Sequence, residues 1–243
     1  MLGRANNMNN FYELNKEKYM AVVAAIEKHI EPYIKEHFSD SETAEIIKTA
    51  RSDFEALYPG LPFIGEANPL TVNLVGAAYE MGIYSGLEKR GLSLKIISHI
   101  NQLALKDYSA SAMTPQSVEF VRNAALSKET IEAAAAESQK KKYTGDWVSE
   151  YLPPEPGSGF DTGVKYTHCG IIDLYRKYGK ERYLPYICLN DYPMYGAMGI
   201  SFKRTKTLAH GADCCDFCFK LKGGKMPSFI EDPEELEEFK NTK

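Results

Sequence analysis

All five cysteines of this 243-residue chain fall within one stretch of fifty positions in its C-terminal third. A cysteine acts as a nucleophile or a metal ligand in its thiolate form, which needs a nearby cation, a base or a helix N-terminus. Side chains that could work with such thiols lie in the same part of the sequence. The pattern therefore predicts a reactive site there, with the candidate catalytic residues Cys169, Cys188, Asp191, His210 and Cys215.

The two histidines differ in how they could serve this site. Cys169 directly precedes a predicted helix, whose first backbone amides would favour a thiolate. His168 adjoins Cys169, but neighbours in a strand face apart, so it need not act as the base of that thiol. His210 lies in a predicted turn, where it could reach a pocket or remain an exposed loop residue.

The second element that could carry chemistry contains Cys188 and Asp191. These residues are three positions apart, so on a helical turn their side chains would share a face. Asp191 could instead initiate a turn, because a Tyr-Pro pair follows it directly. A carboxyl group beside a thiol is a candidate acid or base in catalysis.

The last element contains a Cys-x-x-Cys motif, Cys215 to Cys218, whose spacing is typical of metal and redox sites. If residues 214–221 form a strand, alternate side chains face opposite sides of the sheet. Cys215 would then face the same side as Phe217, while Cys218 would face the other side. We therefore expect no shared ion between them, and we interpret Cys214 and Cys218 as packing or surface residues.

A zinc site is the alternative to a cofactor-free nucleophile. Cys169, Cys188 and Cys215, together with Asp191 or a histidine, would make a tetrahedral ligand set, although the spacing matches no standard zinc finger. The sequence contains no GxSxG, GxxxxGK[ST] or GxGxxG motif, which argues against serine-hydrolase, phosphate-loop and dinucleotide sites.

Composition limits the class of partner. The net charge of −4 and a pI near 5.8 are unlike the basic surface of nucleic-acid-binding proteins. No apolar run approaches the roughly 18 residues that cross a bilayer, and the Asn-rich start does not resemble a signal peptide. We therefore expect a cytoplasmic protein that binds a small molecule, with no nucleic-acid or membrane partner, and that could form a homo-oligomer.

The periodicity of apolar residues predicts a helical first part and a mixed second part. Extended chain broken by a loop is expected over 144–165, a short helix over 171–178, and two strands over 199–208 and 214–221. The fold class is therefore predicted as α+β, with a helical region, 1–143, packed on a small antiparallel sheet in a cysteine-rich region, 144–243, within one integrated domain. The helices of the first region are expected over 12–38, 41–58, 69–89, 96–105 and 115–142.

Three segments carry a resemblance to a known family: YTHCGII at 166–172, YICLND at 186–191 and KRTKTLAHGADCCDF at 203–217. They resemble the L-2-amino-thiazoline-4-carboxylic acid hydrolase family, whose pattern is a cysteine ahead of a short helix, a C-x-x-D element and a closing G-x-x-x-C-D-F strand. The resemblance covers about the last hundred residues well. The pattern maps onto Cys169, then Cys188 and Asp191, then Gly211, Cys215, Asp216 and Phe217.

The resemblance implies hydrolysis of a small cyclic amidine. In the reaction that names the family, water adds at the carbon between the ring sulfur and nitrogen and opens the thiazoline toward N-carbamoyl-cysteine. Cys215 or Cys188 could attack that carbon directly, or a thiolate pair could lie beside an activated water, with Asp191 and a histidine as acid and base. Arg204 could hold a substrate carboxylate bidentately, with His168 as a further substrate-binding residue.

A second family offers a different function. The glycine-then-cysteine ending also resembles the 4-vinyl-reductase ligand-sensing domain, which binds small apolar molecules and uses cysteines for zinc. The alternative function is therefore a small-molecule binding or sensor domain, and a lyase or isomerase on the same scaffold is a third. A buried pocket with convergent cysteine, aspartate and histidine would favour an enzyme, whereas a pocket of Tyr, Phe and Leu alone would favour a binder.

Overall fold

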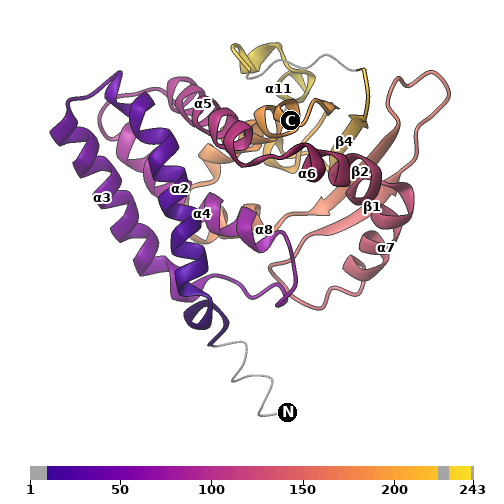
Figure 1. Cartoon of the computed structure of the whole chain (residues 1–243), viewed down its shortest axis with the longest axis horizontal. Helices are drawn as coiled ribbons and strands as arrows, with labels where there is room; N and C mark the ends of the chain where they lie inside the picture. The colour runs from indigo at the N-terminus through magenta and orange to yellow at the C-terminus, as the bar shows by residue number, and fades with distance from the viewer. Residues whose placement is uncertain (1–9, 224–229, 242–243) are drawn as a thin grey trace.

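The computed structural model describes residues 10–223 and 230–241 of the chain, and these form a helical layer and a small sheet. The sheet has four antiparallel strands in the order β1-β2-β4-β3 within these residues: β1 (Val148–Leu152), β2 (Thr162–His168), β3 (Ser201–Lys203) and β4 (Cys215–Lys220). The helical layer lies beside this sheet, to its left in Figure 1. Its long helices are α2 (Lys16–Lys35), α3 (Asp40–Leu57), α4 (Thr71–Glu88) and α5 (Leu94–Ala112). The predicted α+β class is confirmed.

Local signals explain where helix α3 begins. Ser39 is its N-cap in a capping box, in which the Glu42 amide donates to the Ser39 hydroxyl and the Ser39 amide donates to the Glu42 carboxylate. The helix was expected over 41–58, so it begins one residue earlier than predicted. It ends at Leu57, ahead of Pro59 and Gly60.

Helix α4 lies at the centre of the helical layer and is buried on nearly every face. Gly82 lets α3 approach it closely, because a Cβ at this position would lie 3.0 Å from the Cα of Ala50. A Cβ at Gly86 would meet Ile46 at an ordinary 3.6 Å. Within this apolar helix, Glu80 is a buried carboxylate that is 7% exposed.

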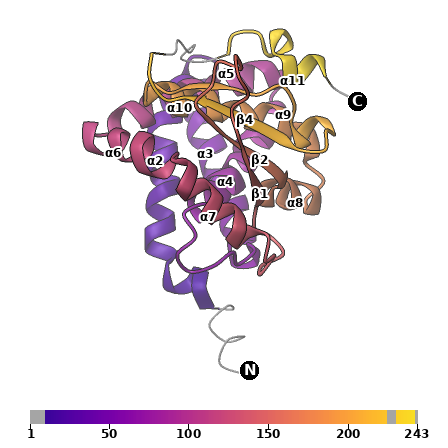
Figure 2. The ribbon, with the colours of Figure 1, turned by 90° about the vertical axis from the view of Figure 1, so that its right-hand side faces the viewer.

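The segment predicted as one helix over 115–142 is divided. Helix α6 (Pro115–Phe120) continues into a π-helical turn over Val121–Ala125, and α7 (Lys128–Ser138) begins anew. Ser127 causes the break, because its hydroxyl accepts a hydrogen bond from the Thr130 amide and so caps a new helix N-terminus. Helix α7 then packs against β1, beside the sheet in Figure 2.

Strand β3 is much shorter than the predicted strand over 199–208. The Asp216 carboxylate accepts hydrogen bonds from the Thr205 and Lys206 amides at 2.9 Å each, so the chain turns away from the ladder at that point. A 3-10 turn over Leu208–His210 follows, and Gly211 adopts a left-handed conformation with φ of 82° at its end.

Short helices connect the two layers, and one hydrophobic cluster joins Leu74 of the helical layer and Tyr175 of a short helix, with Tyr166 of β2 packed against it. Helix α10 packs on α5 and on β3. No helix within the described part of the chain is both long and apolar enough to cross a membrane. The short helices are α8 (Gly170–Lys177), α9 (Leu184–Ile187), α10 (Asp191–Ala197) and α11 (Glu237–Lys240), with 3-10 turns at Tyr58–Gly60, Glu181–Tyr183, Cys188–Asn190 and Pro233–Glu235.

Candidate functional site

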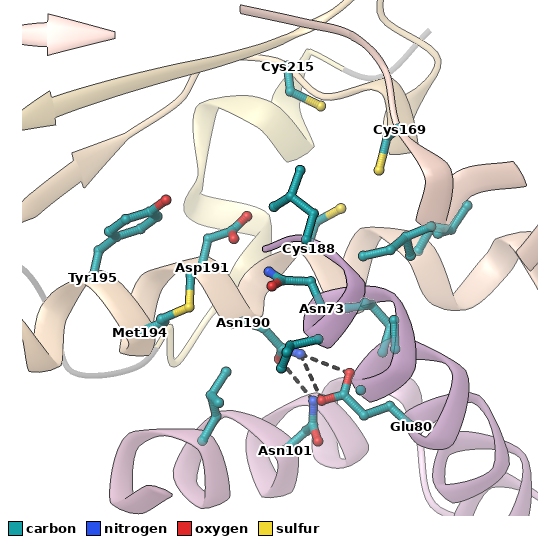
Figure 3. Close-up of a pocket in the computed structure, with 18 of the residues that line it drawn as sticks. Asn73, Glu80, Asn101, Cys169, Cys188, Asn190, Asp191, Met194, Tyr195 and Cys215 are labelled. Atoms are coloured by element: carbon teal, nitrogen blue, oxygen red, sulfur yellow. Dashed lines mark hydrogen bonds between the residues drawn. The ribbon is translucent and has the colours of Figure 1, made fainter. Parts of the chain in front are cut away.

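A cavity of about 270 Å³ lies between helices α2, α4 and α5 on one side and the sheet with helices α8 to α10 on the other. Figure 3 shows three cysteine sulfur atoms facing the same space near its sheet side. The carboxylate of Glu80 lies at the opposite end of this view. Five of the residues predicted from the sequence line the cavity, namely Cys169, Cys188, Asp191, Arg204 and Cys215.

Cys169 is the N-cap residue of α8, as the sequence predicted from its position before a helix. Burial raises the pKa of its thiol to about 11, while the backbone amides of Ile172 and Ile171 and the Trp147 indole act in the opposite direction. The thiol is therefore protonated at rest. The groups that stabilise its thiolate are nevertheless already in place around it.

The position of Cys169 at the start of α8 depends on the glycine that follows it. A Cβ at Gly170 would lie 2.0 Å from the carbonyl oxygen of Gly145, so the start of α8 fits against this loop only without a side chain.

We expect Gly170→Ala to lower the free energy of unfolding by about 1–3 kcal/mol, because the backbone would have to move. Urea denaturation measures the loss. The control is Gly60→Ala, whose Cβ would meet nothing nearer than the Lys177 ammonium at 3.8 Å; an equal effect of both changes would contradict the prediction.

The other two cavity thiols are harder to ionise. Burial raises the pKa of Cys215 to about 12, although its sulfur accepts a hydrogen bond from the Leu208 amide at 3.2 Å and Arg204 lowers the value. Burial raises the pKa of Cys188 well above its ordinary value, and only the charge of Arg204 opposes this strongly. Cys169 is thus the most acidic of the three.

Arg204 and two carboxylates form a buried ion cluster at the wall of the cavity. The Arg204 Nη1 donates to Asp191 Oδ2 at 2.6 Å, and its Nε and Nη2 donate to the Glu238 carboxylate of α11. Nη2 also donates to the carbonyl oxygen of Cys188 at 2.6 Å. Burial lowers the pKa of the guanidinium, and its two carboxylate partners more than offset this effect, so it stays charged.

This cluster also sets the acidity of Asp191. Burial raises the pKa of the Asp191 carboxyl above its ordinary value, and the charge of Arg204 and its hydrogen bond offset only part of that rise. Asp191 can therefore hold a proton more readily than an exposed aspartate. Since it shares the cavity wall with Cys188, the shared face predicted from their spacing is confirmed.

A second polar group at the cavity was missed by the sequence predictions. The side-chain amide of Asn190 donates to both oxygens of the Glu80 carboxylate, at 3.0 and 3.2 Å. The Asn101 amide donates in turn to Asn190 Oδ1 at 2.9 Å. Burial raises the pKa of Glu80 to about 7, and the two amides lower it less. A lone acid in the apolar stretch of α4 is the sequence signal that could have identified it.

Both predicted histidines lie outside the residues that line the cavity. The ring of His168 contacts the carbonyl oxygen of Asp146 at 2.6 Å and the carboxylate of Asp173 at 2.8 Å. His210 packs on the ring of Phe239, and burial together with the charge of Arg204 lowers its pKa to about 4. The structure thus places His210, predicted as catalytic, and His168, predicted as substrate-binding, outside the cavity lining.

The remaining cysteines also lie apart from the cavity. Cys215 and Phe217 line it while Cys218 does not, which confirms the alternation expected for this strand. Within the described residues, no three histidine, cysteine or acidic side chains are grouped closely enough to hold a metal ion. In this conformation the cavity thiols are therefore arranged as separate groups around one space.

The comparisons with known proteins identify the family. A family model described as L-2-amino-thiazoline-4-carboxylic acid hydrolase matches residues 95–219, slightly more than half of the chain. No curated protein and no solved structure matches the chain. The matched region contains all three cavity thiols with Asp191 and Arg204, whereas Glu80 and Glu238 lie outside it. The chain therefore belongs to the L-2-amino-thiazoline-4-carboxylic acid hydrolase family.

Proposed function

We propose that this chain hydrolyses a C–S or C–N bond of a small cyclic amidine, of the 2-aminothiazoline type, and that a cavity cysteine is the nucleophile. The observation that carries the proposal is the convergence of thiols from three separate elements, with Asp191, on one cavity. A cavity of about 270 Å³ suits a single small heterocycle. Family membership supports the same class of reaction.

Cys169 is the nucleophile in this proposal. Its thiol has the lowest pKa of the three that line the cavity, and the amides at the start of α8 stabilise its anion. Because the thiol is protonated at rest, the Asp191 carboxylate takes its proton as the sulfur attacks the amidinium carbon. Asp191 thus acts as the base that neither histidine is placed to supply.

Asp191 then alternates between acid and base. Cys169 Sγ bonds to the amidinium carbon between the ring sulfur and nitrogen, and the thiol proton moves to the Asp191 carboxylate. The C–S bond of the ring breaks, and the leaving sulfur takes this proton from Asp191, whose pKa is raised by burial. Water then adds to the same carbon and gives a proton to Asp191. The C–Sγ bond breaks, the hydroxyl proton returns to Cys169 as the carbonyl forms, and Asp191 releases its proton to solvent.

Cysteine variants test the nucleophile. We expect Cys169→Ser to lower kcat by at least about 10³-fold, because a serine hydroxyl is a far weaker nucleophile than a thiol. Turnover of 2-amino-2-thiazoline and of its 4-carboxylate is followed by the thiol that ring opening releases. Cys218→Ser, which changes a thiol that does not line the cavity, is the matched control and should keep full activity.

Other outcomes separate the alternatives. Full activity of Cys169→Ser with loss in Cys188→Ser or Cys215→Ser would move the nucleophile to another cavity thiol. Full activity of all three would exclude covalent catalysis by cysteine. Tight binding without turnover would favour the sensor function, and one zinc per chain with protected thiols would make these cysteines metal ligands.

A further inference from the structure

Glu80 is a buried carboxylate whose hydrogen-bond partners are neutral amides. It is 7% exposed, and its two oxygens accept hydrogen bonds from the Asn190 amide. No ion pair joins it to a lysine, arginine or histidine among the residues that the structure describes. A buried carboxylate is usually paired with a cation, because burial of an isolated charge is costly. Glu80 also lines the cavity, so a ligand can supply this missing partner.

The neighbouring amides fix Glu80 as an acceptor. Asn101 donates to Asn190 Oδ1, which leaves the Asn190 amide nitrogen directed at Glu80 (Figure 3). Each carboxylate oxygen offers two lone pairs, and the Asn190 amide occupies at most one on each. The remaining acceptor positions suit a planar donor with two N–H groups. An amidinium has this shape and binds a carboxylate bidentately, as arginine does.

The cavity offers little to a negatively charged ligand. Arg204 and His29 are the basic side chains among the described residues that line it. Two carboxylates and the Cys188 carbonyl oxygen already accept four hydrogen bonds from the Arg204 guanidinium. The ring nitrogens of His29 contact the Ala25 carbonyl oxygen at 2.8 Å and the Ser111 hydroxyl at 3.3 Å. A substrate carboxylate would therefore enter a cavity whose acidic groups outnumber its available cations.

We propose that Glu80 is the specificity-determining residue of the cavity, and that it selects a cyclic amidine without a free carboxylate by pairing with the amidinium nitrogens. The proposal rests on the cavity being the substrate site of the proposed function. It assigns the chain a substrate class different from the 4-carboxylate in the family's name. It also replaces the predicted role of Arg204 as a carboxylate clamp, because that guanidinium is already neutralised within the protein.

Equilibrium binding tests this proposal without relying on turnover. Isothermal titration calorimetry compares acetamidine, 2-amino-2-thiazoline and 2-aminothiazoline-4-carboxylate on the wild type. We expect 2-amino-2-thiazoline to bind at least about 10-fold more tightly than its 4-carboxylate, because both offer the amidinium and only the second brings a negative charge among the acidic groups of the cavity. Glu80→Gln should weaken the binding of acetamidine and of 2-amino-2-thiazoline by about 10-fold or more, because one charge-assisted pair is worth about that much. It should also narrow or reverse the preference for 2-amino-2-thiazoline over its 4-carboxylate.

Two variants control for folding and for surface charge. The side-chain amide introduced by Glu80→Gln keeps an oxygen that can accept from Asn190, so the circular dichroism of this variant should match that of the wild type. Glu55→Gln removes an exposed carboxylate on α3, away from the cavity, and should leave all three affinities unchanged.

Each remaining result decides one of the two proposals. The selectivity proposal is overturned if Glu80→Gln binds acetamidine as tightly as the wild type, if the wild type prefers the carboxylate compound, or if no probe binds. Selective binding that depends on Glu80, with no ring opening of either thiazoline, would instead overturn the hydrolase function and leave the selectivity in place.

Discussion

Replacing Arg204 with methionine should lower the free energy of unfolding by about 3–5 kcal/mol, because it leaves buried acids without their cation. The Arg204 side chain is 1% exposed and is paired with the carboxylates of Asp191 and Glu238, whose exposures are 24% and 0%. Removal of the guanidinium leaves these two acids facing each other without a cation. Urea denaturation followed by circular dichroism measures the loss.

The neighbouring residues provide a matched control. Lys203 precedes Arg204 and pairs with Glu237, which precedes Glu238, but both members of this pair are more than half exposed. Lys203→Met should therefore change the free energy of unfolding by less than about 1 kcal/mol. A double variant, Arg204→Met with Glu238→Gln, should recover part of the loss because one unpaired acid is gone. Equal costs for Arg204→Met and Lys203→Met would show that the buried cluster does not stabilise the fold.

The thiol side of the site could be predicted because its determinants are local in sequence. A cysteine before a helix, a cysteine and an aspartate three positions apart, and strand alternation around Cys215 each fix an orientation within a few residues. The predicted α+β class was equally accessible, since helical and extended periodicities separate cleanly along the chain. These elements then need only to pack on one another for Cys169, Cys188 and Cys215 to reach one cavity.

The acidic side could not be predicted in this way, because its contacts join distant segments. Glu80 meets Asn190, 110 residues later in the chain, and Arg204 meets Glu238, 34 residues later. Periodicity places Glu80 within a buried helix but does not say which polar residue will face it. The histidines illustrate the same limit, because His168 and His210 are close to reactive cysteines in sequence and yet lie outside the cavity lining.

Glu80 links this site to the stability of the whole chain. Burial raises its pKa from 4.5 to about 7, so the folded state binds a proton more tightly than the unfolded state. Ionisation of the carboxyl therefore does not lower the free energy of unfolding below about pH 4.5. The loss of stability grows as the pH rises to about 7 and then stays constant. The full loss is roughly 3 kcal/mol, and the protein tolerates it at a position that faces the cavity.

The expected result is that Glu80→Gln is more stable than the wild type by roughly 3 kcal/mol above pH 7, with a difference that vanishes near pH 4.5. Urea denaturation of both proteins across this range gives the difference curve. The raised pKa of Asp191 affects both proteins alike and cancels. Glu55→Gln, at an exposed position, should give a flat curve. A variant that is less stable at every pH would mean that the carboxylate is needed for folding. A gain in stability together with loss of amidine binding would instead mark Glu80 as a residue kept for its ligand.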